Sequence, residues 1–275
     1  MVAEIEERAR ALADRIDELS SAPVDKPTLV YFDIIGICWP VRCLLHLAKV
    51  DYELVQITIE EWFHQIADGT QLLKSRTRNG HLPLYVDADV RLNQSNVILS
   101  YLGEKHDLMG DSRQEKLAAM EVMAHAYDAL FHWSGLLQIN ARVNTPEDVV
   151  AARLAAFLGD GDWGVVSDGY HENLNAFQRY LDANSANGDF IVGSRLSVAD
   201  LHAFNVLCNW YKSFDRERFS AEYPRLDAYI CRIAAIPEVA DYIRLHQEAT
   251  TWLPIPALGL KLTTPEDLVG LTSAM

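Results

Sequence analysis

The sequence predicts a small α/β domain followed by an all-helical domain. Short β-rich runs alternate with helical patterns over the first third of the chain. Beyond Gly110 the chain is helix-like almost throughout, with Gly, Asn, Asp or Pro separating the helical segments. A length of 275 residues suits two modest domains. The expected parts are an N-terminal helical extension and linker (1–26), the α/β domain (27–107), the helical domain (108–253) and a C-terminal tail (254–275).

Composition and charge exclude several function classes. The formal net charge of −15 repels nucleic acid and anionic membranes, so neither is expected as a partner. Four cysteines without a CxxC pair indicate free thiols in a reducing compartment, and no Cys/His cluster has a zinc-site spacing. The chain has no apolar run of ~18 residues and no signal-peptide pattern at its start. We therefore expect a cytosolic protein without a metal.

The N-terminal extension has helical periodicity over residues 1–19, where apolar positions recur among charges. Residues 20–27, with two prolines, are typical of a linker. A docking arm and a loose tail are both compatible with this pattern.

The α/β domain begins with strand-like residues 28–32 and a helix over 40–50, with Pro40 in its first turn. A second strand is expected over 52–59, followed by a polar, irregular segment over 60–80 with room for one helix. The remaining elements of this domain are two strands joined by a tight turn and then a helix: 82–86, 87–89, 90–92 and a helix from Ser95.

The helical domain shows amphipathic patterns separated by breaks. Ser197 and Asp200 form an S-x-x-D capping-box pattern before one helix, which predicts a structural role and no chemistry. The expected helices are 116–139, 146–158, 171–183, 197–211 and 225–236.

Three stretches resemble one family. Residues 27–53 and 79–110 are similar to the glutathione-binding half of soluble glutathione transferases of the tyrosine type (alpha, mu, pi and sigma). Residues 190–207 resemble the capping-box helix of the second domain in that family. The resemblance implies a thioredoxin-like domain followed by an all-helical one, a homodimer, and glutathione as co-substrate of a transferase acting on small hydrophobic electrophiles.

Tyr31, in the first strand, matches the catalytic tyrosine of the family. A thiol with a pKa near ~8.5 is mostly protonated at neutral pH, and a phenolic O–H directed at sulfur stabilises the thiolate. Without the resemblance, an ordinary packed strand tyrosine would be favoured. The resemblance therefore implies that Tyr31 stabilises the thiolate.

Cys38 offers a second catalytic candidate. It stands four residues before Arg42 in a setting similar to the S-x-P-x-R of serine-type members. A helix N-terminus can lower a thiol pKa, whereas burial would make the residue a small packing group. The nearby loop holds Ile35 and Ile37 where several relatives carry arginine, which implies a weaker thiolate site or an apolar substrate pocket that includes Ile37.

Several residues match family positions that bind glutathione. Pro83 matches the family's cis-proline, which would turn the Leu82 backbone toward the cysteinyl part of the tripeptide. Gln94 and Ser95 precede a helix whose N-terminus would receive the γ-glutamyl carboxylate. Trp62 and Lys74 match residues that contact the glycyl carboxylate, although a solvated lysine is equally compatible.

The first long helix of the second domain carries Asp128, which in the family reaches the γ-glutamyl amine across a dimer interface. Met123, Tyr127 and Phe131 on this helix are candidates for the electrophile pocket, although such a stripe also suits plain core packing. Alternatives to a transferase are a thiol oxidoreductase working through Cys38, a non-enzymatic glutathione-binding relative, and an isomerase that uses glutathione as cofactor.

Overall fold

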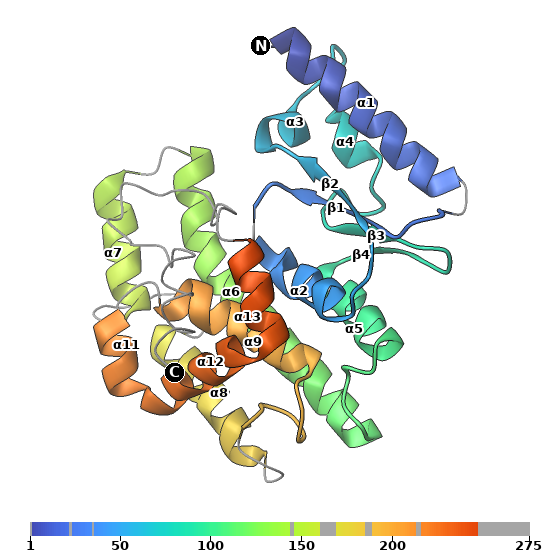
Figure 1. Cartoon of the computed structure of the whole chain (residues 1–275). Helices are drawn as coiled ribbons and strands as arrows, with labels where there is room; N and C mark the ends of the chain where they lie inside the picture. The colour runs from blue at the N-terminus through green and yellow to red at the C-terminus, as the bar shows by residue number, and fades with distance from the viewer. Residues whose placement is uncertain are drawn as a thin grey trace. The chain divides into compact units, whose positions relative to one another are not determined.

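The computed structural model describes residues 2–21, 24–34, 36–143, 146–159, 169–184, 189–212 and 216–246. The chain divides into two compact units, residues 1–102 and 103–275. The first unit contains a small mixed sheet with helices, and the second is helical (Figure 1). This confirms the predicted fold class, a thioredoxin-like domain followed by an all-helical domain. The predicted tail over 254–275 lies outside the described residues.

The sheet of the first unit has four strands in the order β2-β1-β3-β4. β1 pairs in parallel with β2, and β3 is antiparallel to both β1 and β4. β1 is a central strand, so its first four residues are buried. The strand bounds are β1 (Thr28–Phe32), β2 (Glu53–Ile57), β3 (Leu84–Val86) and β4 (Arg91–Asn93).

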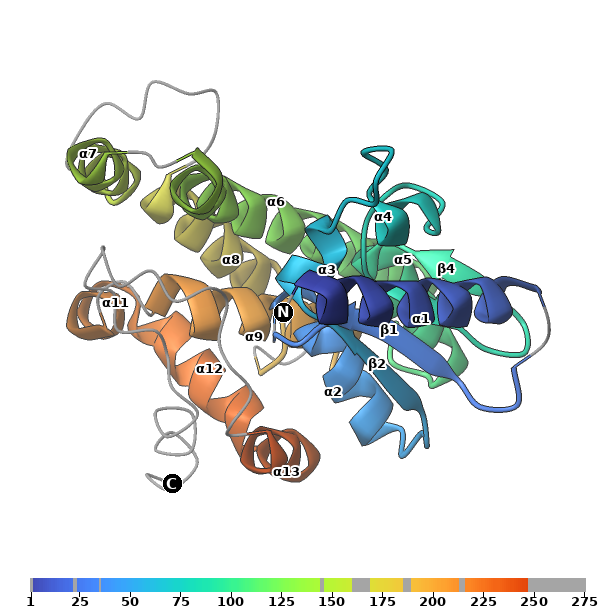
Figure 2. The ribbon, with the colours of Figure 1, turned by 90° about the horizontal axis from the view of Figure 1, so that it is seen from above.

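Helices of the first unit lie on both sides of the sheet. Figures 1 and 2 show α2 and α5 on one side, and α1, α3 and α4 on the other. The expected irregular segment 60–80 contains two short helices, where room for only one was expected. The bounds are α1 (Val2–Ser21), the 3₁₀ turn η1 (Gly36–Cys38), α2 (Trp39–Leu47), α3 (Ile59–Phe63), α4 (Leu72–Ser75) and α5 (Ser95–Lys105).

Helix α1 packs on its own unit. It contacts α3 and α4 (Figure 2), and its apolar face is buried. The buried residues are spaced so that they share one side of the helix: Ala9, Ala13, Ile16 and Leu19. The N-terminal extension is therefore neither a free arm nor a loose tail in this structure.

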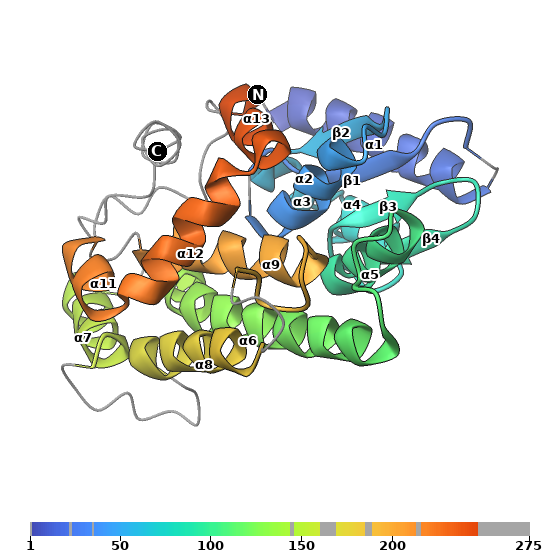
Figure 3. The same cartoon turned by 60° about the horizontal axis from the view of Figure 1, so that its bottom comes forward.

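The helical unit is arranged around α9 (Val198–Val206), all of whose residues are buried. α9 contacts α6 and α12 (Figure 3). It ends in a π-helical turn, η2 (Leu207–Tyr211), where the sequence predicted one continuous α-helix. The sequence patterns did not predict α11 and α13. The other bounds are α6 (Arg113–Val143), α7 (Glu147–Phe157), α8 (Tyr170–Ala183), α11 (Arg216–Glu222), α12 (Pro224–Ala235) and α13 (Pro237–Leu245).

Asp200 holds the start of α9 in place. Its Oδ2 accepts hydrogen bonds from the backbone N–H (2.9 Å) and the hydroxyl (2.8 Å) of Ser197. Its Oδ1 accepts from the Ile191 N–H (2.8 Å) and the Tyr229 hydroxyl (2.9 Å). Burial raises the pKa of Asp200 from 3.8 to about 6, although the four donors favour the charged form. The predicted capping pair is thus a buried structural centre.

Candidate functional site

The ends of three neighbouring strands converge at one edge of the sheet. β1 pairs with β3 at Val30 and Leu84, and β3 pairs with β4 in the same antiparallel sense. Tyr31 follows Val30, Pro83 precedes Leu84 and Gln94 follows Asn93, so all three stand at the same end of these pairings. The strand pairing therefore brings together three residues that the sequence assigned to one site.

The Leu82–Pro83 peptide bond is cis, as the resemblance implies. The Asn93 side chain steadies this turn, because its Nδ2 donates to the carbonyl oxygens of Pro83 (3.1 Å) and His81 (3.3 Å). Within the described residues, no hydrogen bond engages the Leu82 backbone N–H or C=O. An extended ligand could pair with these groups as an added strand.

Ser95 opens α5 with an unsatisfied hydroxyl. Gln94 before it has φ of 77°, a left-handed conformation uncommon outside glycine, and its carbonyl accepts the Ile98 N–H at 3.0 Å. The Ser95 side chain is 2% exposed, and its Oγ has no hydrogen-bond partner among the described residues. A buried hydroxyl without a partner costs ~1–3 kcal/mol, so a ligand acceptor is expected there. The N-terminus of a helix favours an anionic one.

Tyr31 is a buried residue of β1, with 2% exposure. Its ring meets the edge of Phe32 at a centroid distance of 5.4 Å. Phe32 in turn makes a T-shaped contact with Trp62 of α3 at 5.7 Å. These contacts bring α3 to the end of β1, where Trp62 lies beside Phe32.

Lys74 of α4 is held against α3. Its Nζ lies 4.4 Å from the centroid of the Phe63 ring, a cation–π contact. Phe63 directly follows Trp62, so Lys74 and Trp62 are both tied to α3. Trp62 and Lys74, the two residues predicted to contact the glycyl carboxylate, are therefore both positioned by α3.

The structure argues against a reactive Cys38. The residue caps α2, as expected, but it is fully buried. Burial raises the pKa of the Cys38 thiol well above its ordinary value, and nearby Arg42 offsets only part of this. Burial outweighs the charge of Arg42, so the alternative of a small buried packing thiol fits the structure better than that of a lowered pKa.

The loop between β1 and α2 contributes an apolar side chain. Ile37 lies in η1 and is half-buried, while Gly36 before it has φ of 47°. Ile35 lies outside the described residues. Position 37 therefore carries an apolar side chain and adds no cation to this loop.

The candidate residues on α6 have different environments. Met123 is 1% exposed and belongs to the core of the helical unit. Tyr127 is half-buried, and its ring lies 4.5 Å from that of Phe131, which is 44% exposed. Burial and then the charge of exposed Asp128 raise the pKa of Tyr127. Tyr127 and Phe131 form a partly exposed aromatic pair, whereas Met123 lies in the core.

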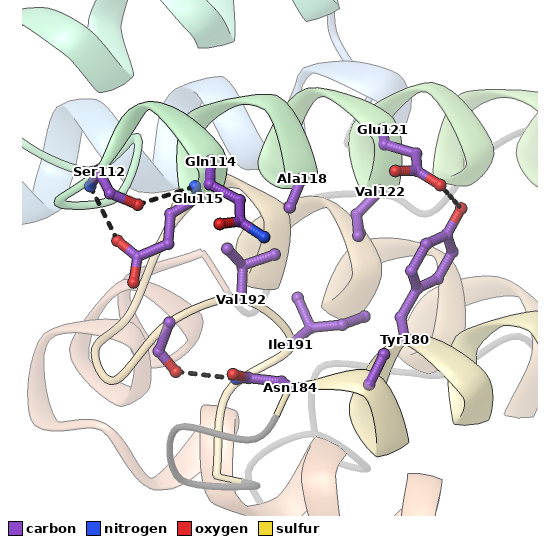
Figure 4. Close-up of a pocket in the computed structure, with 12 residues that line it drawn as sticks. Ser112, Gln114, Glu115, Ala118, Glu121, Val122, Tyr180, Asn184, Ile191 and Val192 are labelled. Carbon is purple, nitrogen blue, oxygen red and sulfur yellow. Dashed lines mark hydrogen bonds between the residues drawn. The ribbon is translucent and has the colours of Figure 1, made fainter.

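A cavity of about 480 Å³ lies in the helical unit between α6, α8 and residues 191–193 (Figure 4). None of the predicted pocket residues lines it. Several of its polar groups are engaged within the protein. Glu115 accepts the backbone N–H groups of Asp111 and Ser112 at the start of α6, and Asn184 donates to the carbonyls of Phe190 and Gly193.

The described part of the chain carries neither a metal cluster nor a membrane-spanning helix. It contains no group of three or more His, Cys, Asp or Glu side chains that could hold a metal ion. None of its helices is both long and apolar enough to cross a membrane.

The sequence patterns did not single out three residues that position the site: Phe32, Glu61 and Phe63. Nothing in the local pattern distinguishes the two phenylalanines from ordinary packing residues. Glu61 did leave a signal, because Thr58 and Glu61 have the spacing of a capping box. The structure contains that box, with the Thr58 Oγ1 accepting the Glu61 N–H and the Glu61 Oε2 accepting the Thr58 N–H.

Comparison with known proteins agrees with this geometry. A family model described as "Glutathione S-transferase, N-terminal domain" matches residues 27–104, and one described as "Glutathione S-transferase, C-terminal domain" matches residues 166–246. Glutathione S-transferase P 1 of Xenopus laevis is 29% identical over 216 residues, 78% of this chain and 91% of that protein. Glutathione S-transferase Mu 7 of Rattus norvegicus is 26% identical over 233 residues, 83% of this chain and 94% of that protein.

A solved structure supports the same fold. The pi-class glutathione S-transferase of Onchocerca volvulus superposes with a TM-score of 0.65 at 21% identity, covering 84% of this chain and 99% of that one. The two family models together match more than half of the chain and fall on its two units in the expected order. The chain therefore belongs to the glutathione S-transferase family of enzymes.

Proposed function

We propose that this enzyme activates glutathione as a thiolate and transfers it to small hydrophobic electrophiles, with Tyr31 as the thiolate donor. The observation that carries the proposal is the convergence of Tyr31, the cis Leu82–Pro83 turn and the unsatisfied Ser95 hydroxyl at one edge of the sheet. Titration calorimetry with millimolar glutathione tests the first step. The proposal fails if no heat of binding is detected.

Each segment of the tripeptide has a complementary group in the first unit. The cysteinyl backbone would pair with the free N–H and C=O of Leu82. The γ-glutamyl carboxylate would accept the Ser95 hydroxyl and the first N–H groups of α5 beside Gln94. The glycyl carboxylate would lie near Trp62 and Lys74, where the ammonium supplies the opposite charge.

Tyr31 would act on the sulfur once the tripeptide is bound. A phenolic donor to a thiolate forms a charge-assisted hydrogen bond, stronger than a bond between neutral groups. Lowering the thiol pKa by one unit takes ~1.4 kcal/mol, which one such bond can supply. The electrophile would be held close to this thiolate by apolar groups that include Ile37, Tyr127 and Phe131, with Met123 packed behind them.

Replacing Ser95 with alanine is expected to weaken glutathione binding about tenfold, because a carboxylate loses a hydroxyl donor worth ~1.5 kcal/mol. Calorimetry measures the change. The Ser20→Ala variant is the matched control, because the Ser20 hydroxyl already donates to the Ile16 carbonyl on α1. Equal affinities for the Ser95→Ala variant and the wild type would remove Ser95 from the site.

The oxidoreductase alternative is weaker, because it needs Cys38 as a thiolate. That thiol is fully buried, and burial raises its pKa well above the ordinary value. A thiol that stays protonated is a poor nucleophile toward a disulfide. Tyr31 requires no such ionisation, since the donor acts as a neutral hydroxyl.

The proposal includes a homodimer in the cytosol. Leu117 and Met120 on α6 are 57% and 51% exposed, so this helix presents two large apolar side chains to solvent. With Asp128, which is also exposed, their spacing places them along one face of that helix. A second copy covering this face would bring its Asp128 toward the partner's glutathione amine. All four cysteines are free, which suits a reducing compartment.

Replacing Leu117 with glutamate is expected to produce a monomer of 31.0 kDa, because a buried unpaired charge opposes association. Light scattering after gel filtration measures the mass, which should be twice this value for the wild type. The Leu245→Glu variant is the control, since Leu245 is an exposed leucine on α13. A wild-type monomer at micromolar concentration would contradict the dimer.

A further inference from the structure

Helix α1 is linked by an ion pair to a carboxylate next to the site. The Nε of Arg8 lies 2.6 Å from the Oε1 of Glu61. The Glu61 side chain is only 4% exposed, whereas that of Arg8 is 61% exposed. The arginine thus reaches from the surface to a buried acid, and Arg8 supplies an opposite charge to it.

Glu61 contacts α1 through one carboxylate oxygen and caps α3 through the other. Its Oε2 accepts the Thr58 N–H at 2.8 Å and so caps α3, while its Oε1 takes Arg8. α3 is five residues long, too short to be stable by its own hydrogen bonds. Its position therefore depends on the cap and on what packs against it, which includes α1.

The three consecutive residues Glu61, Trp62 and Phe63 have three different partners. Glu61 binds α1, Trp62 packs its ring against Phe32 of β1, and Phe63 lies under the Lys74 ammonium. A shift of Glu61 along or about the α3 axis would move the other two side chains with it. The ion pair to α1 thus constrains both residues assigned to the glycyl carboxylate.

A second ion pair ties α1 to the other end of this segment. The Oδ2 of Asp17 lies 3.3 Å from the Nε of Arg76, the residue that ends α4. Between the two ion pairs, Ala9, Ala13 and Ile16 bury the apolar face of α1. Segment 58–76 is therefore held near both of its ends by one helix.

We propose that α1 sets the affinity for the glycyl end of glutathione, with Arg8 as a positioning residue that acts through Glu61 on Trp62 and Lys74. This inference rests on the proposed function, because it concerns the same bound tripeptide. Helix α1 then contributes to binding through α3, without being assigned a contact to the ligand.

The Arg8→Gln variant tests this inference through the split between KM and kcat. We expect the KM for glutathione to rise about fivefold, as befits a largely exposed ion pair, while kcat changes less than twofold. With γ-glutamylcysteine, which lacks the glycine, the variant and the wild type should have the same KM. Loss of stability alone would affect both thiols equally, so the difference between them identifies positioning.

Two arginine variants and one aspartate variant complete the experiment. The Arg244→Gln variant is the matched control, because Arg244 forms a half-exposed ion pair with Asp241 on α13 and should leave KM unchanged. Arg8→Lys should restore most of the affinity, and Asp17→Asn should raise the KM for glutathione selectively as well. An unchanged KM for Arg8→Gln, or an equal rise with γ-glutamylcysteine, would overturn the inference. If the wild type itself binds neither thiol, the proposed function fails instead.

Discussion

Replacing Asp200 with alanine is expected to lower the free energy of unfolding by about 4 kcal/mol or more. The substitution leaves four donors without an acceptor in the core, and each unsatisfied donor costs ~1–3 kcal/mol. Domains of this kind have ~5–15 kcal/mol in total, so the variant should unfold partly near body temperature. Urea unfolding followed by far-ultraviolet circular dichroism measures the loss.

The Asp148→Ala variant is the control for this experiment. Asp148 is an exposed carboxylate on α7 of the same unit, and its removal should change stability by no more than about 0.5 kcal/mol. A loss of less than about 1 kcal/mol in the free energy of unfolding for Asp200→Ala would contradict the structural role assigned to Asp200.

The pH dependence of stability gives a second measurement on Asp200. Its pKa is raised from 3.8 to about 6 in the folded protein, so between these pH values the folded state binds more protons than the unfolded state. Its contribution, ~3 kcal/mol, is fully present below about pH 4 and is lost as pH rises through about 6. The Asp200→Asn variant cannot titrate there. The stability difference between wild type and this variant should therefore shrink over that window.

Replacing Tyr31 with phenylalanine is expected to lower kcat/KM for conjugation about a hundredfold at neutral pH. The change removes one donor to a developing anion, a loss that typically costs a factor of ~10²–10³. The pKa of the bound glutathione thiol should rise by ~1–2 units, because the thiolate loses its hydrogen bond. Ultraviolet absorbance of the thiolate against pH measures this pKa, and conjugation of a chlorodinitrobenzene measures the rate.

Two variants separate this effect from its alternatives. Tyr85→Phe removes a hydroxyl from a buried tyrosine of the same sheet, whose partner is the Asp87 carboxylate, and should leave the thiol pKa unchanged. Cys38→Ser should leave conjugation within about twofold of wild type, since a buried thiol that stays protonated takes no part. An activity lost with Cys38→Ser and retained with Tyr31→Phe would reverse the assignment.

Much of the fold could be predicted from hydrophobic periodicity and turn residues in the sequence. Strand-like residues 28–32 become β1, and the S-x-x-D pattern becomes the cap of α9. Local patterns suffice in these cases, since the stabilising contacts lie within a few residues of each other. Pro83 was recognised through the family resemblance, because a proline at the start of an edge strand is ordinary by itself.

The remaining features depend on contacts between distant segments. Cys38 is fully buried at the start of α2, and no local pattern reports how deeply a residue will be buried. Met123 and Tyr127 are four residues apart and so lie on one face of α6, yet Met123 is buried and Tyr127 is only half-buried. Arg8 and Glu61 are 53 positions apart, so their pairing becomes visible only when the chain has folded.

The position of α1 also bears on the order in which the chain acquires structure during synthesis. Residues 2–21 leave the ribosome before their partners in 58–76, the last of which follows some 55 residues later. At ~5–20 residues per second, the helix waits for several seconds with its inner face unpaired. Two of the four residues on that face are Ala9 and Ala13, which expose little apolar surface. Small side chains there lower the risk that nascent chains associate before their own partners emerge.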